Sequence, residues 1–233
     1  MTELVAEVET TYGAEVGLAA TAPNSTTAPV VVGSWTTGHA WSTIKVPLAI
    51  AALTRQPVGA DAAAAITVSD NAAAQRLWDG LGSGDAAGQA VEVVLAQGGD
   101  TTTVVQRTRT RPEYTAFGQT NWSLSSQVQF AANFPTSPAA QTVWALMGNI
   151  SGSQSWGLGR LPDAHFKGGW GPDNGGYTVR QFGSIAQGEG CVAVAIGTEA
   201  ATFDTGVAVL NDLADGLAEL SDQLPVGPCY QAI

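Results

Sequence analysis

Apolar positions follow a helical spacing in some parts of the chain and form short runs in others. Residues 2–12 have helical spacing, whereas 14–22 and 29–35 are short apolar runs separated by the turn residues NSTTA. Two such runs around a turn predict a β-hairpin after a short N-terminal helix.

A long alanine-rich region extends from residue 41 to about residue 159. Its pattern is helical, and Gly and Pro interrupt it at RQPVGAD, GLGSGD, AQGGD and NFPTSPAA. Such residues end helices or connect them, so the region predicts a block of several short helices.

The last third of the chain returns to short apolar runs. HFKGGW (165–170) and GYTVRQFG (176–183) predict two strands joined by a Gly/Pro/Asn turn, and GCVAVAIGT (190–198) predicts a buried strand. Residues 204–224 have apolar positions at helical spacing and predict a closing helix.

The order of these elements predicts an α/β (α+β) fold in a single domain over residues 1–233. The terminal segments would form one sheet flanked by terminal helices, giving an α/β lobe of residues 1–40 and 160–233. Residues 41–159 would form an inserted all-α lobe. A cleft between two lobes is a common place for a site.

The composition narrows the class of protein and its partners. Of 233 residues, 45% are apolar and only 12% are charged, which is typical of a globular protein, and the net charge is −11. Such a surface repels nucleic acid and anionic membranes, and no window approaches the length of a membrane span. The two histidines and two cysteines have no metal-ligand spacing, so we expect no metal and no cofactor.

The two cysteines allow two interpretations. Cys191 begins an apolar run and Cys229 lies in the C-terminal tail, so one could be a buried thiol and the other an exposed thiol. An antiparallel return of the closing helix would instead bring Cys229 near Cys191, and a disulfide there would imply an oxidising compartment.

The stretch AWSTIKVPLAIAAL carries Ser42 and Lys45 three residues apart in an apolar helical pattern. Residues with this spacing share one helix face. Lys45 could extend its methylene chain and keep its ammonium in water. The alternative is that Lys45 is held beside Ser42 in order to take its proton.

Two further polar motifs follow. Ser69-Asp70-Asn71 interrupts an apolar run, where it could simply cap a helix, since these residue types favour that position. Lys167-Gly168-Gly169 lies on a predicted strand before a turn, where it could be a hairpin with a solvated lysine. No helix follows these glycines, so a phosphate loop is a poor interpretation.

Taken together, Ser-x-x-Lys, Ser-Asp-Asn and Lys-Gly-Gly occur in the order of the serine β-lactamase and penicillin-binding-protein (D-Ala-D-Ala peptidase) superfamily, which the chain resembles as a compact, divergent, class A-like member. YGAEVGLAA, ITVSDNAAAQRLW and VWALMGN with GLGRLPDAHFKGGWG also resemble segments of that family. The resemblance covers most of the chain. It implies the β-lactamase/transpeptidase-like fold, in which the sheet is antiparallel.

The resemblance also implies the catalytic roles. Ser42 corresponds to the acylated nucleophile and Lys45 to the base that activates it. Ser69 would relay a proton to the leaving group. Lys167 would supply positive charge near this relay and the substrate.

The implied substrate-binding residues are Asn71, Gly168, Gly169 and Trp170. Asn71 would donate or accept a hydrogen bond with a substrate amide or with its own neighbours. The backbone N–H groups of Ser42 and Trp170 would form the oxyanion hole, because Trp170 directly follows Lys167-Gly168-Gly169.

The chain departs from the family pattern at three points. Gly168 replaces a Thr or Ser whose hydroxyl helps to bind a substrate carboxylate. Class A members of the family have an arginine on the next strand that supports this contact. Counted without gaps from Lys167, its position is occupied here by Gly176, and Arg180 is a weak substitute. In RPEYTAF, Glu113 matches the deacylating glutamate, but Phe117 stands where that motif has Asn, so Glu113 is a candidate deacylation base or only an exposed partner of an arginine.

These features predict a serine hydrolase that acts through a Ser42 acyl-enzyme on a peptide, amide or ester. A catalytically weak or inactive cell-envelope binding protein with the same fold is the alternative. We expect a monomer that acts on a small-molecule or peptide substrate. The family implies a secreted or cell-envelope location in bacteria, and therefore an export signal that this sequence does not include.

Overall fold

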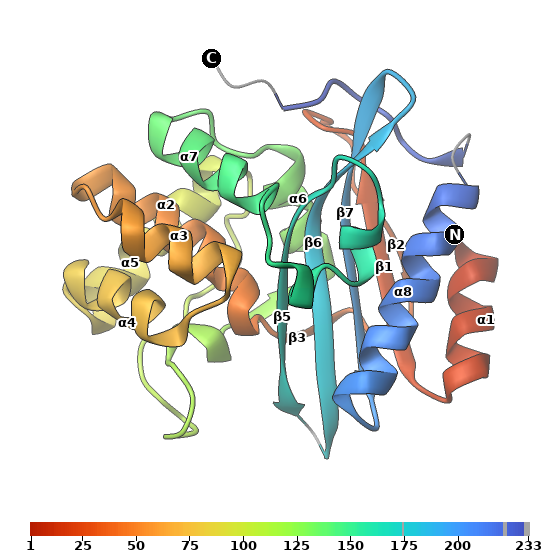
Figure 1. The fold of residues 1–233 in the computed structure, drawn as a ribbon, viewed down its shortest axis with the longest axis horizontal. Coiled ribbons are helices and arrows are strands. Elements are labelled where there is room, and N and C mark those ends of the chain that lie inside the picture. Colours follow the sequence, from red (N-terminus) through yellow and green to blue (C-terminus); the bar gives the residue numbers. More distant parts are fainter. Residues whose placement is uncertain (174, 221–222, 231–233) are drawn as a thin grey trace.

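The computed structural model describes residues 1–173, 175–220 and 223–230, and its centre is a five-stranded sheet (Figure 1). The strand order is β2-β1-β7-β6-β5, and every neighbouring pair is antiparallel. The strands are β1 (Glu15–Thr21), β2 (Val30–Gly33), β5 (His165–Asp173), β6 (Gly176–Gln187) and β7 (Gly190–Ala200). The antiparallel sheet predicted from the terminal segments is therefore present, with β5 at one edge.

Two helices cover one face of the sheet, and a helical lobe lies on the other side (Figure 1). The first two are α1 (Thr2–Tyr12) and α8 (Phe203–Glu219). The helical lobe consists of α2 (Lys45–Arg55), α3 (Gly59–Thr67), α4 (Asn71–Gly80), α5 (Gly84–Gln97), α6 (Leu124–Ala132) and α7 (Pro138–Met147). Four single turns of 3₁₀ helix connect these elements: η1 (Trp41–Ile44), η2 (Phe117–Gln119), η3 (Gly152–Gln154) and η4 (Gly157–Arg160).

The central strand β7 separates two hydrophobic cores. Val192, Val194 and Ile196 belong to the core under α1 and α8, whereas Ala193 and Ala195 belong to the core shared with the helical lobe. Because both faces of β7 are buried, its sequence is a continuous apolar run and does not alternate with polar residues. The small alanine side chains leave room for the helices that pack on that face.

The structure corrects the predicted elements in two places. The region 41–159 is not wholly helical, because β4 (Asn121–Ser123) lies in it and pairs with β3 (Thr37–His39) in a separate two-stranded sheet. A three-residue strand is too short to show a period of its own. The closing helix ends at Glu219, earlier than residue 224, and residues 221–222 lie outside the described part.

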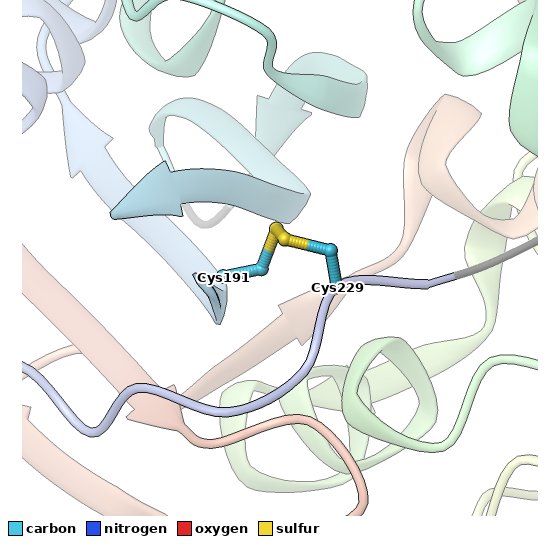
Figure 2. The surroundings of a disulfide bond; sticks show 2 residues. All are labelled: Cys191 and Cys229. Carbon is cyan, nitrogen blue, oxygen red and sulfur yellow. A yellow bond between two sulfur atoms is a disulfide. The ribbon is translucent and has the colours of Figure 1, made fainter. Parts of the chain in front are cut away.

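A disulfide joins Cys191, the second residue of β7, to Cys229 in the C-terminal tail (Figure 2). The backbone N–H of Cys191 also donates to Gly227 O, and Gly227 N–H donates to Cys191 O, both at 2.9 Å. The tail is therefore fixed to the end of the sheet by one covalent bond and two hydrogen bonds. No helix among the described residues is long and apolar enough to cross a bilayer.

Candidate active site

The turn that carries Ser42 has an unusual backbone. The preceding Trp41 has φ of +49°, a left-handed conformation that costs a non-glycine residue about 1–3 kcal/mol. Its ring is held edge-on against Tyr114 with centroids 5.0 Å apart. Ser42 follows in the 3₁₀ turn η1, and Lys45 is the first residue of α2. Ser42 thus lies in a 3₁₀ turn and Lys45 in the α-helix that directly follows it, whereas the sequence predicted one regular helix for both.

Lys45 is buried, with 1% of its surface exposed. Nζ lies 2.7 Å from Ser69 O, 2.7 Å from Asn71 Oδ1 and 3.3 Å from Ser69 Oγ. Burial lowers the pKa of Lys45 to about 7, and the Asp70 carboxylate offsets part of this shift. Of the two interpretations of Lys45, the structure therefore excludes the solvated one.

Ser69-Asp70-Asn71 both caps α4 and points polar groups at Lys45. The Asp70 carboxylate accepts a hydrogen bond from Ala73 N–H at 2.7 Å, which satisfies one of the free donors at the start of the helix. Ser69 has φ of +58°, outside the helix. This conformation directs both Ser69 O and Ser69 Oγ toward the lysine.

Lys167 reaches the same serine from the sheet. It is fully buried on β5, and its Nζ donates to Ser69 Oγ at 3.0 Å and to Gly168 O at 2.9 Å. Burial, followed by the positive charge of Lys45, lowers the pKa of Lys167 well below its usual value. Ser69 Oγ therefore lies between two lysines whose charged forms are both disfavoured.

The edge strand β5 passes very close to the Ser42 turn. A Cβ atom on Gly169 would lie 2.8 Å from Ser42 N and 2.9 Å from Thr43 N, which is closer than real Cβ contacts. Only glycine therefore fits at this position. The approach brings β5, of which Trp170 is the next residue, against the turn that carries Ser42.

Two polar contacts hold the Ser42 turn against the sheet. His39 Nδ1 lies 2.7 Å from Asp173 Oδ2, which links the residue three before Ser42 to the residue three after Trp170. Arg180 is fully buried and donates to Gly38 O and His39 O at 3.0 and 3.1 Å. Its burial lowers its pKa to about 9.

A cavity of about 310 Å³ opens in front of Ser42. It is lined by Trp41, Ser42, Lys45, Asn71, Arg109, Glu113, Tyr114, Thr115, Gly118, Trp170, Gly171, Pro172 and Tyr177. Glu113 is the one carboxylate in this lining, and its side chain is 60% exposed with Arg111 3.8 Å away. The loop that carries Glu113 is held by Gln119, whose side chain bonds to the backbone of Arg111, Tyr114 and Thr115.

Comparison with solved structures identifies the fold. A β-lactamase from Burkholderia vietnamiensis superposes with a TM-score of 0.75 at 18% identity, covering 94% of this chain and 96% of that one. A β-lactamase from Sphaerobacter thermophilus gives 0.71 at 19% identity, covering 96% and 97%, and an ancestral class A β-lactamase gives 0.70 at 20%, covering 94% and 98%. The chain has the β-lactamase fold. No family model and no curated protein sequence matches it.

Within this β-lactamase fold, the residues proposed from sequence gather around one site. Those that line the cavity are Ser42, Lys45, Asn71, Glu113 and Trp170. Ser69 connects to it through a hydrogen bond from Lys45, and Lys167 connects through its hydrogen bond to Ser69. Among the described residues, no hydrogen bond joins Ser42 to Lys45 or to Glu113. Such contacts are often longer in a site without substrate.

Gly168 is a candidate that neither lines the cavity nor has a side chain that bonds to a residue of the lining. A Cβ atom there would meet the Trp156 ring at 3.3 Å, so an indole occupies the space beside this residue. Arg180 pairs with Gly169 across the β5–β6 hairpin, but its guanidinium lies behind the Ser42 turn and not in the cavity. Neither residue therefore provides a free group for a substrate carboxylate.

The close approach at Gly169 leads to a prediction. Gly169→Ala should lower the rate of Ser42 acylation about 100-fold, because the methyl group pushes the Ser42 backbone N–H away from β5. Stopped-flow or intact-mass kinetics with an activated ester would measure this rate. Gly168→Ala is the matched control, since its methyl group meets side-chain ring atoms of Trp156 and Trp170 at 3.3–3.6 Å and no backbone atom of the Ser42 turn. Equal rates for the two variants would show that the approach at Gly169 does not matter for acylation.

Sequence reasoning missed the supports of the site. His39 and Asp173 are 134 positions apart, and Asp173 belongs to a segment that predicts only a turn. Trp156 likewise gives no signal of its contact with Gly168. No group of three or more His, Cys, Asp or Glu side chains that could hold a metal ion occurs in residues 1–173, 175–220 and 223–230.

Proposed function

We propose that the protein is a serine hydrolase that forms an acyl-enzyme at Ser42 with a peptide, amide or ester. The observation that carries this proposal is the contact of Ser69 Oγ with two buried lysines directly beside a nucleophile candidate at the cavity wall. A solvated lysine and a simple helix cap would not require this arrangement. A buried ammonium is costly, and active sites are where such groups are found.

The hydrogen bonds of Lys45 suit it to act as a base. Ser69 O and Asn71 Oδ1 can only accept, so a neutral Lys45 spends both N–H groups on them and keeps its lone pair for a proton. It would take the proton of Ser42 as Ser42 Oγ attacks the carbonyl carbon. The N–H groups of Ser42 and Trp170 would stabilise the oxyanion that forms.

Collapse of this intermediate would break the bond to the leaving group. Ser69 would give its proton to the leaving atom and take back the proton that Lys45 received from Ser42. Lys167 donates a hydrogen bond to Ser69 Oγ and would orient this hydroxyl throughout. The acyl group then remains on Ser42 until water attacks it.

We propose Glu113 as the base for that water, although its position suits the task poorly. Its carboxylate is mostly exposed and faces Arg111 at 3.8 Å, so it is not held in position to orient a water beside Ser42. Slow deacylation follows, and the acyl-enzyme should accumulate. A catalytically silent binding protein of the cell envelope is the alternative outcome of the same test.

Intact-mass spectrometry would test the proposal. A fluorophosphonate and an activated ester should each add one group to the folded protein, and peptide mapping should place it on Ser42. A fluorescent penicillin would show whether β-lactams also react. Ser42→Ala should take up no label, and folded wild-type protein that also takes up none would leave only the binding-protein alternative.

We also propose that the chain acts as a monomeric single domain outside the cytoplasm, secreted or in the cell envelope. The Cys191–Cys229 disulfide supports an oxidising compartment, because thiols stay reduced in most cytoplasms. The net charge of −11 argues against nucleic acid and leaves a small molecule or peptide as the partner.

A further inference from the structure

We propose that the cleft selects uncharged esters with an aromatic or branched apolar acyl group and discriminates against acyl groups that carry a carboxylate. This inference rests on the proposed function and names its substrate class. Three observations carry it: the position of the cavity relative to Ser69, the aromatic residues that line the cavity, and the hydrogen bonds that the basic side chains around the cavity already make.

The direction of the cavity assigns it to the acyl group. The leaving group must face Ser69, which contacts Lys45 and Lys167. The cavity extends from Lys45 and Asn71, on the Ser69 side, past Ser42 and Trp170 to Gly171 and Pro172, the later part of β5. The acyl group lies on the side of the carbonyl opposite the leaving group, and therefore in the part of the cavity next to Gly171 and Pro172.

The walls of the cavity are aromatic. Trp41, Tyr114, Trp170 and Tyr177 all line it, and Gly171 and Gly118 add surfaces without side chains. A volume of about 310 Å³ accommodates a group of the size of a phenyl ring with its linker. Apolar and aromatic groups gain free energy when such walls remove them from water.

The basic side chains around the cavity already have partners. Arg109 donates to Pro112 O and to Gln75 Oε1, at 3.3 and 3.2 Å. Arg111 donates to Pro172 O at 2.8 Å and stacks over the Tyr114 ring at 4.4 Å. Lys45 is hydrogen-bonded to the Ser-Asp-Asn segment. These acceptors compete with an anionic acyl group for the N–H donors of the basic side chains.

The overall charge of the chain also disfavours an anion. The lining holds Arg109 and the exposed Glu113 carboxylate, which has Arg111 3.8 Å away, and the chain as a whole carries −11. The Trp156 ring covers Gly168, where an added Cβ atom would meet it at 3.3 Å. Gln181 fixes this tryptophan by donating to Trp156 O at 2.8 Å and accepting from Leu158 N–H at 2.7 Å. This indole therefore closes the space beside Gly168.

Four p-nitrophenyl esters with the same leaving group would test this inference. In kcat/KM, which reports acylation, the phenylacetate should exceed the acetate by about ten- to a hundred-fold. The hemisuccinate, which carries a carboxylate, should react at least about ten-fold more slowly than the valerate, its uncharged counterpart of similar length. Similar values for all four esters, or a preference for the hemisuccinate, would overturn the proposal.

Two variants locate the effect. Tyr177→Ala should lower the ratio of phenylacetate to acetate several-fold, because it removes one aromatic wall. Val104→Ala, an exposed residue that is not part of the cavity lining, should keep the wild-type ratio. An unchanged ratio in Tyr177→Ala would place the acyl group elsewhere. Fluorophosphonate labelling of Ser42 separates this failure from failure of the proposed function, since labelling does not depend on the ester ratios.

Discussion

Replacing Lys45 by methionine should lower the rate of Ser42 acylation by about 10³- to 10⁴-fold, which is the upper range for loss of a positioned general base. Methionine has a similar length and fits a buried position, but it cannot accept a proton. Lys45→Arg is the sharper variant. It keeps a cation near Ser69 and Asn71, and a guanidinium does not lose its proton in the accessible pH range. Acylation by Lys45→Arg at the wild-type rate would refute the role of Lys45 as base.

The pH dependence of the same reaction gives an independent test. The pKa of Lys45 is about 7, and only the neutral amine can take the Ser42 proton. The acylation rate of the wild type should therefore rise as the pH increases through about 7 and then level off. A rate that falls over this range would contradict the assignment. Stopped-flow measurement with a p-nitrophenyl ester, corrected for spontaneous hydrolysis, would show it.

The low pKa of Lys45 also links folding stability to pH. In the unfolded chain its pKa returns to 10.5, so between about pH 7 and pH 10.5 the unfolded state binds one more proton than the folded state. The contribution of Lys45 to stability therefore rises with pH in this window, by at most about 1.4 kcal/mol per pH unit. Relative to Lys45→Met, the wild type should gain stability from pH 7 to pH 10 in urea titrations. A constant difference would show that Lys45 keeps an ordinary pKa in the folded state.

Removing the disulfide should give the second large effect, on stability. The bond between Cys191 and Cys229 closes a loop with a sequence separation of 38. The chain-entropy model gives about 4 kcal/mol for a loop of this length, because the bond restricts the unfolded chain. In Cys191→Ser/Cys229→Ser, the Tm should fall by about 8–15 °C for a chain of this size. Differential scanning calorimetry would measure the change.

Reductant provides the matched control for this prediction. It should lower the Tm of the wild type to that of the double variant and leave the double variant unchanged. The backbone contacts between Cys191 and Gly227 remain in both proteins, so the difference isolates the covalent bond. Two free thiols in a non-reducing, denaturing titration of the wild type would show that the disulfide is not formed.

The sequence was sufficient to predict most of the fold, because its elements differ in period and are bounded by strong signals. The runs at 14–22 and 29–35 predict the β1–β2 hairpin, and helical spacing predicts α1 and α8, although α8 ends at Glu219. The short strand β4 escaped prediction because three residues cannot establish a period. Its pairing with β3 is a contact between distant segments, and no local pattern encodes such a contact.

The sequence by itself also singled out Ser42, Lys45, Ser69 and Lys167, since polar residues in apolar runs are conspicuous and their order resembles a known family. Only the tertiary structure decided which groups they and their supports contact: Lys45 is bonded to Ser69 and Asn71, His39 to Asp173, and Trp156 covers Gly168. In an ungapped count of the sequence, the family's supporting arginine is replaced by Gly176. In the structure, the register of the β5–β6 hairpin pairs Arg180 with Gly169, and the Arg180 side chain is buried behind Ser42. Local patterns report which residues are buried and with what period. Which side chains meet depends on the register of β5 and β6 and on the packing of the helical lobe against them, and these arise only when the whole chain folds.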